Sequence, residues 1–206
     1  MIAVVDYGVN NLRSVTRALA ACGHAATLTA DPDRVRSAER VLLPGVGNFG
    51  QAAATLAASG LGDALGEVVR ASRPVMGICL GMQLFFARSE EAPGAAGLRL
   101  LEGEVVRFRT GRPVPHVGWA GVTLAPAGRS HPVLAGALAG GSEYFYHVHS
   151  YHPAGVPESA VLARGEYDGP FPTVVGRDHL LGVQFHPEKS QRAGLALLDA
   201  FARWRP

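Results

Sequence analysis

Short apolar runs alternate with longer Ala- and Leu-rich stretches over residues 1–80, and this alternation constrains the fold more than any other feature of the chain. A brief apolar run bounded by Gly, Pro or Asp is typical of a buried strand, whereas the longer stretches suit helices. Strands that alternate with helices form a mainly parallel sheet covered on both faces. The predicted strands are Ile2–Val5, Ala25–Thr29, Val41–Leu43 and Pro74–Cys79.

The second half of the chain is richer in Gly and Pro and is predicted to contain more β-structure. Its strand candidates are Glu104–Phe108, Tyr144–His149, Ala160–Ala163 and Leu180–Phe185. A final helix near Ala193–Trp204 carries apolar residues along one face. The 206 residues suit one ordinary domain. We therefore expect a single α/β domain over residues 1–206, flavodoxin-like and doubly wound, with helices on both faces of a mainly parallel central sheet.

Charge and hydropathy exclude several classes of partner. The net charge is only +2, with 19 basic and 17 acidic residues intermixed, so no basic stripe is available to follow a phosphate backbone. No apolar stretch is long enough to cross a bilayer, and the start of the chain does not resemble a signal peptide. We expect a soluble, cytoplasmic protein that binds neither nucleic acid nor membrane.

The chain has two cysteines, Cys22 and Cys79, which form no C-x-x-C pair. Neither a zinc site nor a disulfide framework is indicated. Cys22 shares the apolar face of a predicted helix with Leu12, Val15 and Leu19, so we interpret it as a packing residue. Cys79 requires another explanation.

The segment Met76–Gln83 takes a predicted strand into Gly-x-Cys-x-Gly and then into a helical stretch. This is a cysteine version of the nucleophile elbow, in which glycines permit a tight turn that presents the nucleophile at its tip. The N-terminus of the following helix favours a thiolate. The alternative is a small buried thiol whose flanking glycines merely allow the strand and the helix to pack closely.

The segment Gln184–Ser190 follows another apolar strand and contains a candidate base and its orienting group. Because Pro187 disfavours helical geometry in the preceding residue, His186 is predicted to be extended, and His186 and Glu188 can then share one face. Glu188 would bind one imidazole nitrogen and leave the other to exchange a proton with Cys79. The alternative is an exposed turn after an edge strand.

The loop Leu43–Phe49 also follows a strand and contains Pro-Gly-Val-Gly. Glycines allow backbone N–H groups to turn toward an anion. The amides of Val46 or Gly47, together with that of Leu80 after the nucleophile, could form an oxyanion hole. A Gly-x-Gly loop alone is weak support, since an ordinary turn has the same composition.

Taken together, these three segments resemble the class I, triad-type glutamine amidotransferases. Further segments are similar to the glutaminase subunits of imidazole glycerol phosphate synthase, and the similarity spans almost the whole chain. These segments are Asp6–Gly8, Asn11–Leu12, Pro115–Trp119 and Tyr146–Tyr151.

The resemblance implies that glutamine is hydrolysed to glutamate without any cofactor. Cys79 would attack the side-chain amide, His186 would protonate the departing ammonia, and Glu188 would orient His186. Ammonia would pass through a channel to a separate cyclase subunit in a heterodimer. That subunit would make imidazole glycerol phosphate and aminoimidazole carboxamide ribotide in histidine biosynthesis.

The same resemblance implies two further sets of residues. Contacts to glutamine fall at Gly47, Gln83, Glu91, His149, Ser150 and Tyr151, with Glu91 as the partner of the substrate ammonium group. The surface that faces the cyclase includes Asn11, Trp119, Tyr146 and Lys189. Core packing or surface decoration is the alternative interpretation of this second set.

Two positions depart from the family pattern. Asn10 stands where glycine is usual, and Ala120 follows Trp119 where asparagine is common. Both lie near the expected subunit contact, so they bear on docking and not on the chemistry.

Three other interpretations remain open from the sequence. His147, His149 and His152 form an H-x-H-x-x-H cluster that could bind a metal, although no acidic or cysteine ligands accompany them. A binding subunit could keep the fold without activity. A related glutaminase could serve a different synthase.

Overall fold

A nine-stranded sheet runs through the protein, whose computed structural model describes residues 1–205. The strand order is β2-β1-β3-β4-β11-β10-β9-β6-β7. The first five strands of this order are mutually parallel: β2 (Ala26–Thr29), β1 (Ile2–Val5), β3 (Arg40–Gly45), β4 (Val75–Cys79) and β11 (Leu180–Val183). The other four continue the sheet in antiparallel fashion: β10 (Pro170–Arg177), β9 (Val161–Glu166), β6 (His116–Leu124) and β7 (Ser142–His149).

This topology confirms the predicted fold class. The order of the parallel strands is that of flavodoxin-like sheets, and the second half of the chain supplies all four strands of the antiparallel extension. Strand β3 is longer than predicted and includes Pro44 and Gly45, because both pair with β4. The chain thus has an α/β architecture, and the segments that follow its parallel strands β3, β4 and β11 contain the residues of the candidate site.

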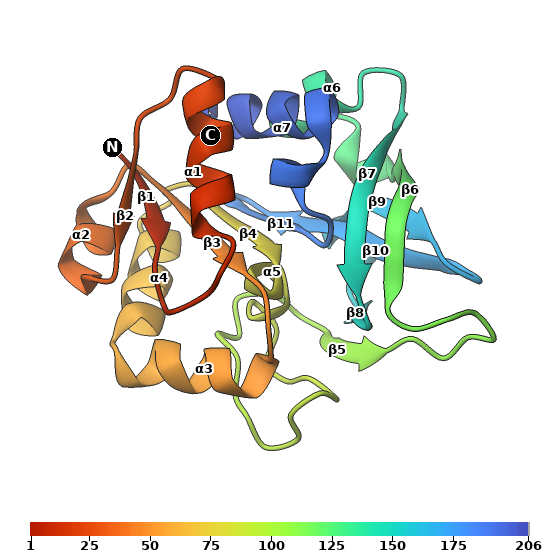
Figure 1. Cartoon of the computed structure of the whole chain (residues 1–206), viewed down its shortest axis with the longest axis horizontal. Coiled ribbons are helices and arrows are strands. Elements are labelled where there is room, and N and C mark those ends of the chain that lie inside the picture. The colour runs from red at the N-terminus through yellow and green to blue at the C-terminus, as the bar shows by residue number, and fades with distance from the viewer. Residues whose placement is uncertain (206) are drawn as a thin grey trace.

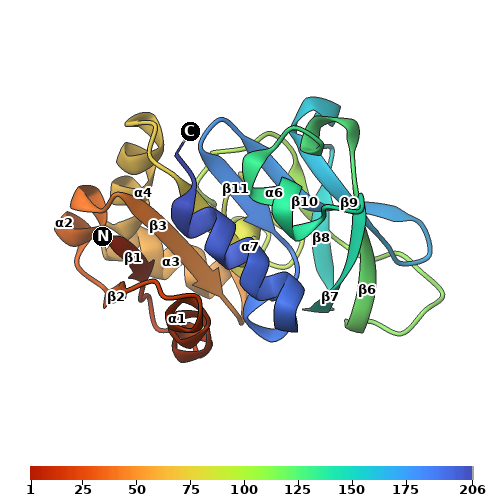
Figure 2. The same ribbon diagram turned by 90° about the horizontal axis from the view of Figure 1, so that it is seen from above.

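Helices cover both faces of the sheet (Figures 1 and 2). One face carries α1 (Leu12–Ala21), α6 (Pro132–Ala137) and α7 (Gln191–Arg203), and the other carries α2 (Pro32–Ser37), α3 (Phe49–Ala58) and α4 (Leu61–Arg70). Strand β1 is buried on both sides: Ile2 and Val4 pack with the first set, and Ala3 and Val5 with the second. Each face therefore has its own apolar core.

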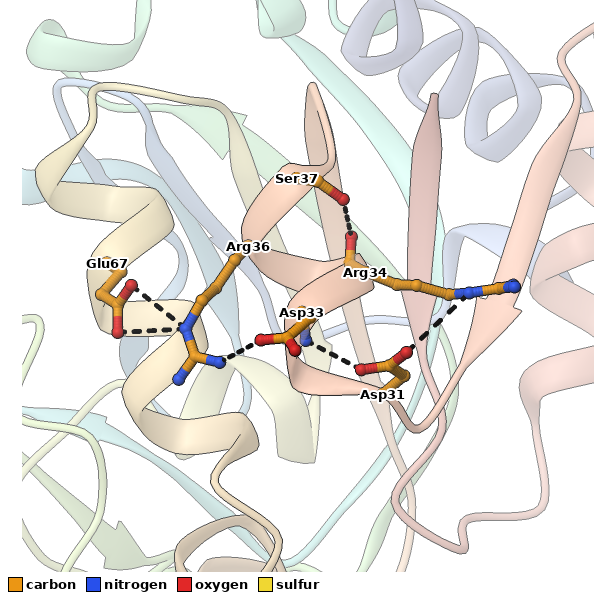
Figure 3. Close-up of polar contacts among 6 residues, drawn as sticks. All are labelled: Asp31, Asp33, Arg34, Arg36, Ser37 and Glu67. Carbon is orange, nitrogen blue, oxygen red and sulfur yellow. Dashed lines mark hydrogen bonds and ion pairs between the residues drawn. The ribbon is translucent and has the colours of Figure 1, made fainter.

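Exposed ion pairs join α2 to α4 (Figure 3). The Arg36 Nε lies 3.1 Å from both carboxylate oxygens of Glu67, and its Nη1 donates to Asp33 at 2.8 Å. Asp31 caps α2 by accepting a hydrogen bond from the Asp33 amide. Because exposed pairs of this kind typically contribute about 1 kcal/mol or less, the apolar faces of α2 and α4 remain the main attachment.

Short elements complete the fold. Helix α5 (Leu80–Gln83) follows β4, and β5 (Glu104–Arg107) pairs with β8 (Tyr151–Ala154) in a separate antiparallel ribbon. Three 3-10 turns are η1 (Pro126–Gly128), η2 (Glu158–Ala160) and η3 (Pro187–Lys189). Within residues 1–205, no helix has the length and apolar character needed to cross a membrane.

Candidate active site

A pocket of about 300 Å³ lies where three adjacent parallel strands end. The strands β3, β4 and β11 deliver Val46, Cys79 and His186 to its wall. This is the edge at which open α/β sheets bind their ligands. The remaining lining residues are Gly47, Leu80, Gln83, Glu91, Pro115, Val148, His149, Ser150 and Tyr151. The structure thus brings together every residue predicted for the oxyanion hole and for substrate binding, and adds Pro115 and Val148.

Backbone geometry at Cys79 is that of a strained elbow. The residue has φ +54° and ψ −110°, is only 6% exposed, and immediately precedes α5. A non-glycine residue in this region of φ and ψ is held there by its surroundings at an energetic cost, and such residues gather at functional sites. The nucleophile elbow predicted from the sequence is therefore present in geometry.

The glycines of the elbow are required by close packing. A Cβ at Gly77 would lie 2.6 Å from the Phe85 ring and 2.7 Å from the Gly81 carbonyl oxygen. A Cβ at Gly81 would lie 2.8 Å from the carbonyl carbon of Leu43 and closer still to its oxygen. Gly77 therefore lets the turn at Cys79 pack against the helix that follows it. Since Leu43 belongs to β3, Gly81 lets the same turn approach the strand that leads into the Val46–Gly47 loop.

His186 and Glu188 form a buried pair. The His186 Nδ1 lies 2.7 Å from the Glu188 Oε1, and both side chains are 0% exposed. His186 is extended, with φ −102° and ψ 95°, as Pro187 predicts. Glu188 is not on a continuation of the strand, as the shared-face prediction assumed, because η3 turns the chain at this point. The turn instead folds the carboxylate back onto the imidazole.

Electrostatics favour a charged imidazolium in this pair. Burial lowers the pKa of His186, but the negative charge of Cys79 and the hydrogen bond with Glu188 outweigh it and raise that pKa to about 10. Burial raises the pKa of Glu188, but the His186 partner outweighs this and lowers it overall. Because Nδ1 is held by the carboxylate, the buried Nε2, which has no hydrogen-bond partner, is the nitrogen left for proton transfer.

Two residues that the sequence did not identify as supports hold this pair in place. Ser190 is fully buried; its hydroxyl donates to the His186 carbonyl at 2.6 Å and accepts from the Tyr146 amide at 3.0 Å. The Asn11 Nδ2 donates to the Glu188 Oε1 at 3.1 Å. Both residues stand in motifs noted above, but their contacts depend on segments that are distant in the sequence.

Polar groups converge on the pocket from the Glu91 loop, from helix α5 and from the end of strand β7. Glu91 accepts a hydrogen bond from the Phe49 amide at 2.8 Å with one carboxylate oxygen. The Gln83 Nε2 donates to the Tyr151 carbonyl at 3.1 Å, and the same carbonyl lies 2.8 Å from the His149 Nδ1. The pocket therefore combines a carboxylate, an amide and an imidazole above the Cys79 sulfur, which suits a small polar substrate.

The residues predicted to face a partner do not all lie on the surface. Trp119 is 47% exposed and meets Tyr146 edge to face, and the exposed Lys189 holds its ammonium 5.8 Å from the Tyr146 ring centre. Val117 and Tyr144, on the same two strands, are also exposed. Asn11, in contrast, is only 7% exposed and is bonded to Glu188. Of the two departures from the family pattern, Asn10 is exposed and Ala120 is half-buried beside Trp119.

The histidines of the H-x-H-x-x-H cluster each bond to the protein. The His147 ring contacts the Phe145 carbonyl and the Thr173 hydroxyl, both at 3.0 Å. The Nδ1 atoms of His149 and His152 contact the Tyr151 and Pro153 carbonyls. Over residues 1–205, no three His, Cys, Asp or Glu side chains are grouped as ligands of a metal ion.

Comparison with known proteins gives near full-length similarity to one family. The profile described as "Glutamine amidotransferase class-I" matches residues 3–203. The imidazole glycerol phosphate synthase subunit HisH of Symbiobacterium thermophilum is 46% identical over 202 residues, which cover 98% of this chain and 93% of that protein. The subunit of the same name from Chloroflexus aurantiacus is 44% identical, with 99% and 96% covered.

A solved structure supports the fold alone. The PurLQS structure from Thermotoga maritima superposes with a TM-score of 0.78 at 18% identity, covering 97% of this chain and 96% of that one.

Proposed function

Since the chain belongs to the class I glutamine amidotransferase family, we propose that it is the glutaminase subunit of an imidazole glycerol phosphate synthase, active in histidine biosynthesis. The observation that carries this proposal is the pocket in which an elbow cysteine meets a buried His–Glu pair and a set of polar groups sized for glutamine. The near full-length similarity to HisH subunits supports this particular synthase. Residues 1–206 would act as one glutamine amidotransferase domain in the cytoplasm.

The first half of the reaction forms a thioester. The reaction starts from the ion pair in which the Cys79 proton already resides on the His186 Nε2, in keeping with the raised pKa of His186, and the thiolate sulfur attacks the side-chain amide carbon of glutamine. The developing oxyanion is stabilised by the Leu80 amide and by an amide of the Val46–Gly47 loop. His186 then returns the proton to the amide nitrogen, so ammonia leaves and a glutamyl thioester remains.

The second half releases glutamate. His186, now neutral, takes a proton from a water molecule that attacks the thioester carbon. The tetrahedral intermediate collapses, the carbon–sulfur bond breaks, and Cys79 is regenerated. Glu188 accepts a hydrogen bond from Nδ1 and keeps that nitrogen protonated throughout. Proton transfer to and from His186 therefore takes place at Nε2 alone.

Recognition of glutamine follows from the lining of the pocket. The Glu91 carboxylate is the partner of the substrate ammonium group. The Phe49 amide donates to its Oε2, which holds the carboxylate in place and leaves Oε1 for the ammonium group. Gln83 and the segment His149–Tyr151 contact the rest of the amino acid. Gly47 has φ +112°, a conformation that suits glycine and shapes the loop beside the reacting amide.

The ammonia would pass to a cyclase subunit across the surface formed by Trp119, Tyr146 and Lys189, with Asn11 beneath it. Exposed aromatic and apolar side chains on β6 and β7 support an interface there, because such residues are enriched in interface cores. The cyclase would use the ammonia to make imidazole glycerol phosphate and aminoimidazole carboxamide ribotide.

The test is glutamate release from glutamine by the purified chain, alone and with a cyclase subunit and its ribonucleotide substrate. We expect a poor glutaminase alone, and stimulation of about tenfold or more by the pair, because lowering the activation barrier by only about 1.4 kcal/mol raises the rate tenfold. Activity without stimulation would indicate another synthase. No activity in any mixture would indicate a binding subunit.

The interface can be tested through Lys189, the only lysine among the 19 basic residues. Reductive methylation should therefore modify just two amines, Lys189 and the N-terminus. We expect the cyclase to protect Lys189 about fivefold or more, since burial in an interface removes a side chain from reagent. The Met1 amine, at the opposite end of the parallel strands, is the internal control. Equal labelling of Lys189 with and without the cyclase would exclude it from the interface.

A further inference from the structure

The side chain of Gln184 contacts the Cys79 sulfur without lining the pocket. Gln184 follows β11, is 0% exposed, and its Nε2 lies 3.7 Å from the Cys79 Sγ. It is not among the residues that line the pocket. A substrate in the pocket therefore does not explain this contact, and the catalytic steps derived above do not use it.

The orientation of the Gln184 amide is fixed by a chain of hydrogen bonds. The Tyr151 carbonyl can only accept, so the Gln83 group bonded to it must be the Nε2 donor. The same Nε2 also donates to the Gln184 Oε1 at 3.2 Å. Gln184 consequently presents its own NH2 group, and not its oxygen, to the Cys79 sulfur.

The backbone also holds Gln184 in this position. The Gln184 amide donates to the Thr173 carbonyl of β10 at 2.8 Å, and His186 follows two residues later in extended geometry. The chain bends at Gln184 and Phe185 after β11, and across this bend the Gln184 carboxamide contacts the Cys79 sulfur while His186 lines the same pocket as Cys79. One stretch of chain therefore delivers both the imidazole and the carboxamide to the nucleophile.

We propose that Gln184 is a further residue of the catalytic centre, whose carboxamide donates a hydrogen bond to the Cys79 sulfur and stabilises its thiolate form. An amide N–H bonds a charged sulfur more strongly than a neutral thiol, so the contact favours the form that attacks glutamine. The inference rests on Cys79 being the nucleophile of the proposed function.

A purely structural role makes a different prediction. Buried amides are almost always paired, so Gln184 could bond to Gln83 only to satisfy its own polarity. In that case its loss would reduce stability without changing the pH at which Cys79 becomes reactive. The pH dependence of the thiol therefore distinguishes the two roles.

The test is the rate at which iodoacetamide alkylates Cys79 in the Gln184→Met variant and in the wild-type protein, in buffers from about pH 5 to about pH 10. Mass spectrometry of the peptide that contains Cys79 gives the rate at each pH. Met has a similar length but no donor, and Gln83 keeps its bond to Tyr151. We expect the midpoint of the pH profile to rise by about one unit and the rate at neutral pH to fall about tenfold, with recovery at high pH. Cys22 in the same sample is the internal reference.

Gln51→Met, the same exchange at an exposed position of α3, is the matched control and should leave the midpoint unchanged. A folded Gln184→Met protein with the wild-type midpoint would overturn the proposal. If that variant does not fold, NMR of the wild-type protein decides. The Gln184 side-chain amide signals should move with the Cys79 midpoint by more than those of Gln83, and static Gln184 signals would overturn the proposal.

The failure of this inference can be distinguished from the failure of the proposed function. The alkylation profile needs neither glutamine nor a partner, whereas failure of the nucleophile assignment would appear as glutamine-dependent activity that survives the loss of Cys79.

Discussion

Replacement of Cys79 by Ala is expected to abolish glutamine-dependent synthesis by the complex while leaving synthesis from ammonium salts intact. Without the sulfur no thioester can form, and loss of a nucleophile of this kind typically lowers turnover by about 10⁴-fold or more. Alanine removes only the sulfur atom from a residue that lines the pocket, so the fold and the ammonia-dependent reaction of the cyclase should persist. Product formation with glutamine and with ammonium chloride is the measurement.

Cys22→Ala is the matched control. Cys22 is only partly buried, and its sulfur donates to the Leu195 carbonyl of α7 at 3.4 Å, well outside the pocket. The variant should retain both activities. Glutamine-dependent activity that persists in Cys79→Ala would show that the nucleophile has been assigned wrongly.

Local patterns were sufficient to predict the parallel half of the fold. Strands β1, β4 and β11 lie within predicted apolar runs, because buried parallel strands need continuous apolar sequence. Strand β2 was also predicted, although it is an edge strand with Leu28 exposed. Strands β6, β8 and β10 were not predicted. They contain Gly118, Pro153 and Pro172, residues with poor strand propensity, and pairing with neighbouring strands overrides that propensity.

In the candidate site, too, some residues could be predicted from the sequence and others could not. Cys79, His186 and Glu188 stand in short motifs, so the sequence could propose them as one site, and the structure places Cys79 in an elbow and joins His186 to Glu188. The supports of that site could not be identified, because they act across the fold. Gln184 reaches a sulfur 105 positions earlier, and Asn11 reaches a carboxylate 177 positions later. No local periodicity encodes such contacts, which arise only once β1, β4 and β11 lie in register.

Gly81→Ala is expected to destabilise the protein severely. The added Cβ would lie 2.8 Å from the Leu43 carbonyl carbon and would overlap its oxygen, and both atoms belong to the backbone of β3. Relief requires the elbow and β3 to separate, since no flexible side chain can move aside. Overpacking of this kind costs about 3 kcal/mol or more of unfolding free energy. Urea denaturation monitored by circular dichroism is the measurement.

A separation of the elbow from β3 that relieves this clash would also lower the glutaminase activity. Strand β3 leads into the Val46–Gly47 loop, and the elbow carries the Leu80 amide, so parting them would pull apart the two sides of the proposed oxyanion hole. We therefore expect any folded fraction of Gly81→Ala to lose glutaminase activity as well. Gly136→Ala is the control, because that glycine lies in α6 with open space around it and without positive φ. It should gain about 0.5–1 kcal/mol. If Gly81→Ala unfolds at the wild-type urea concentration, the close approach of the elbow to β3 is not what positions the nucleophile.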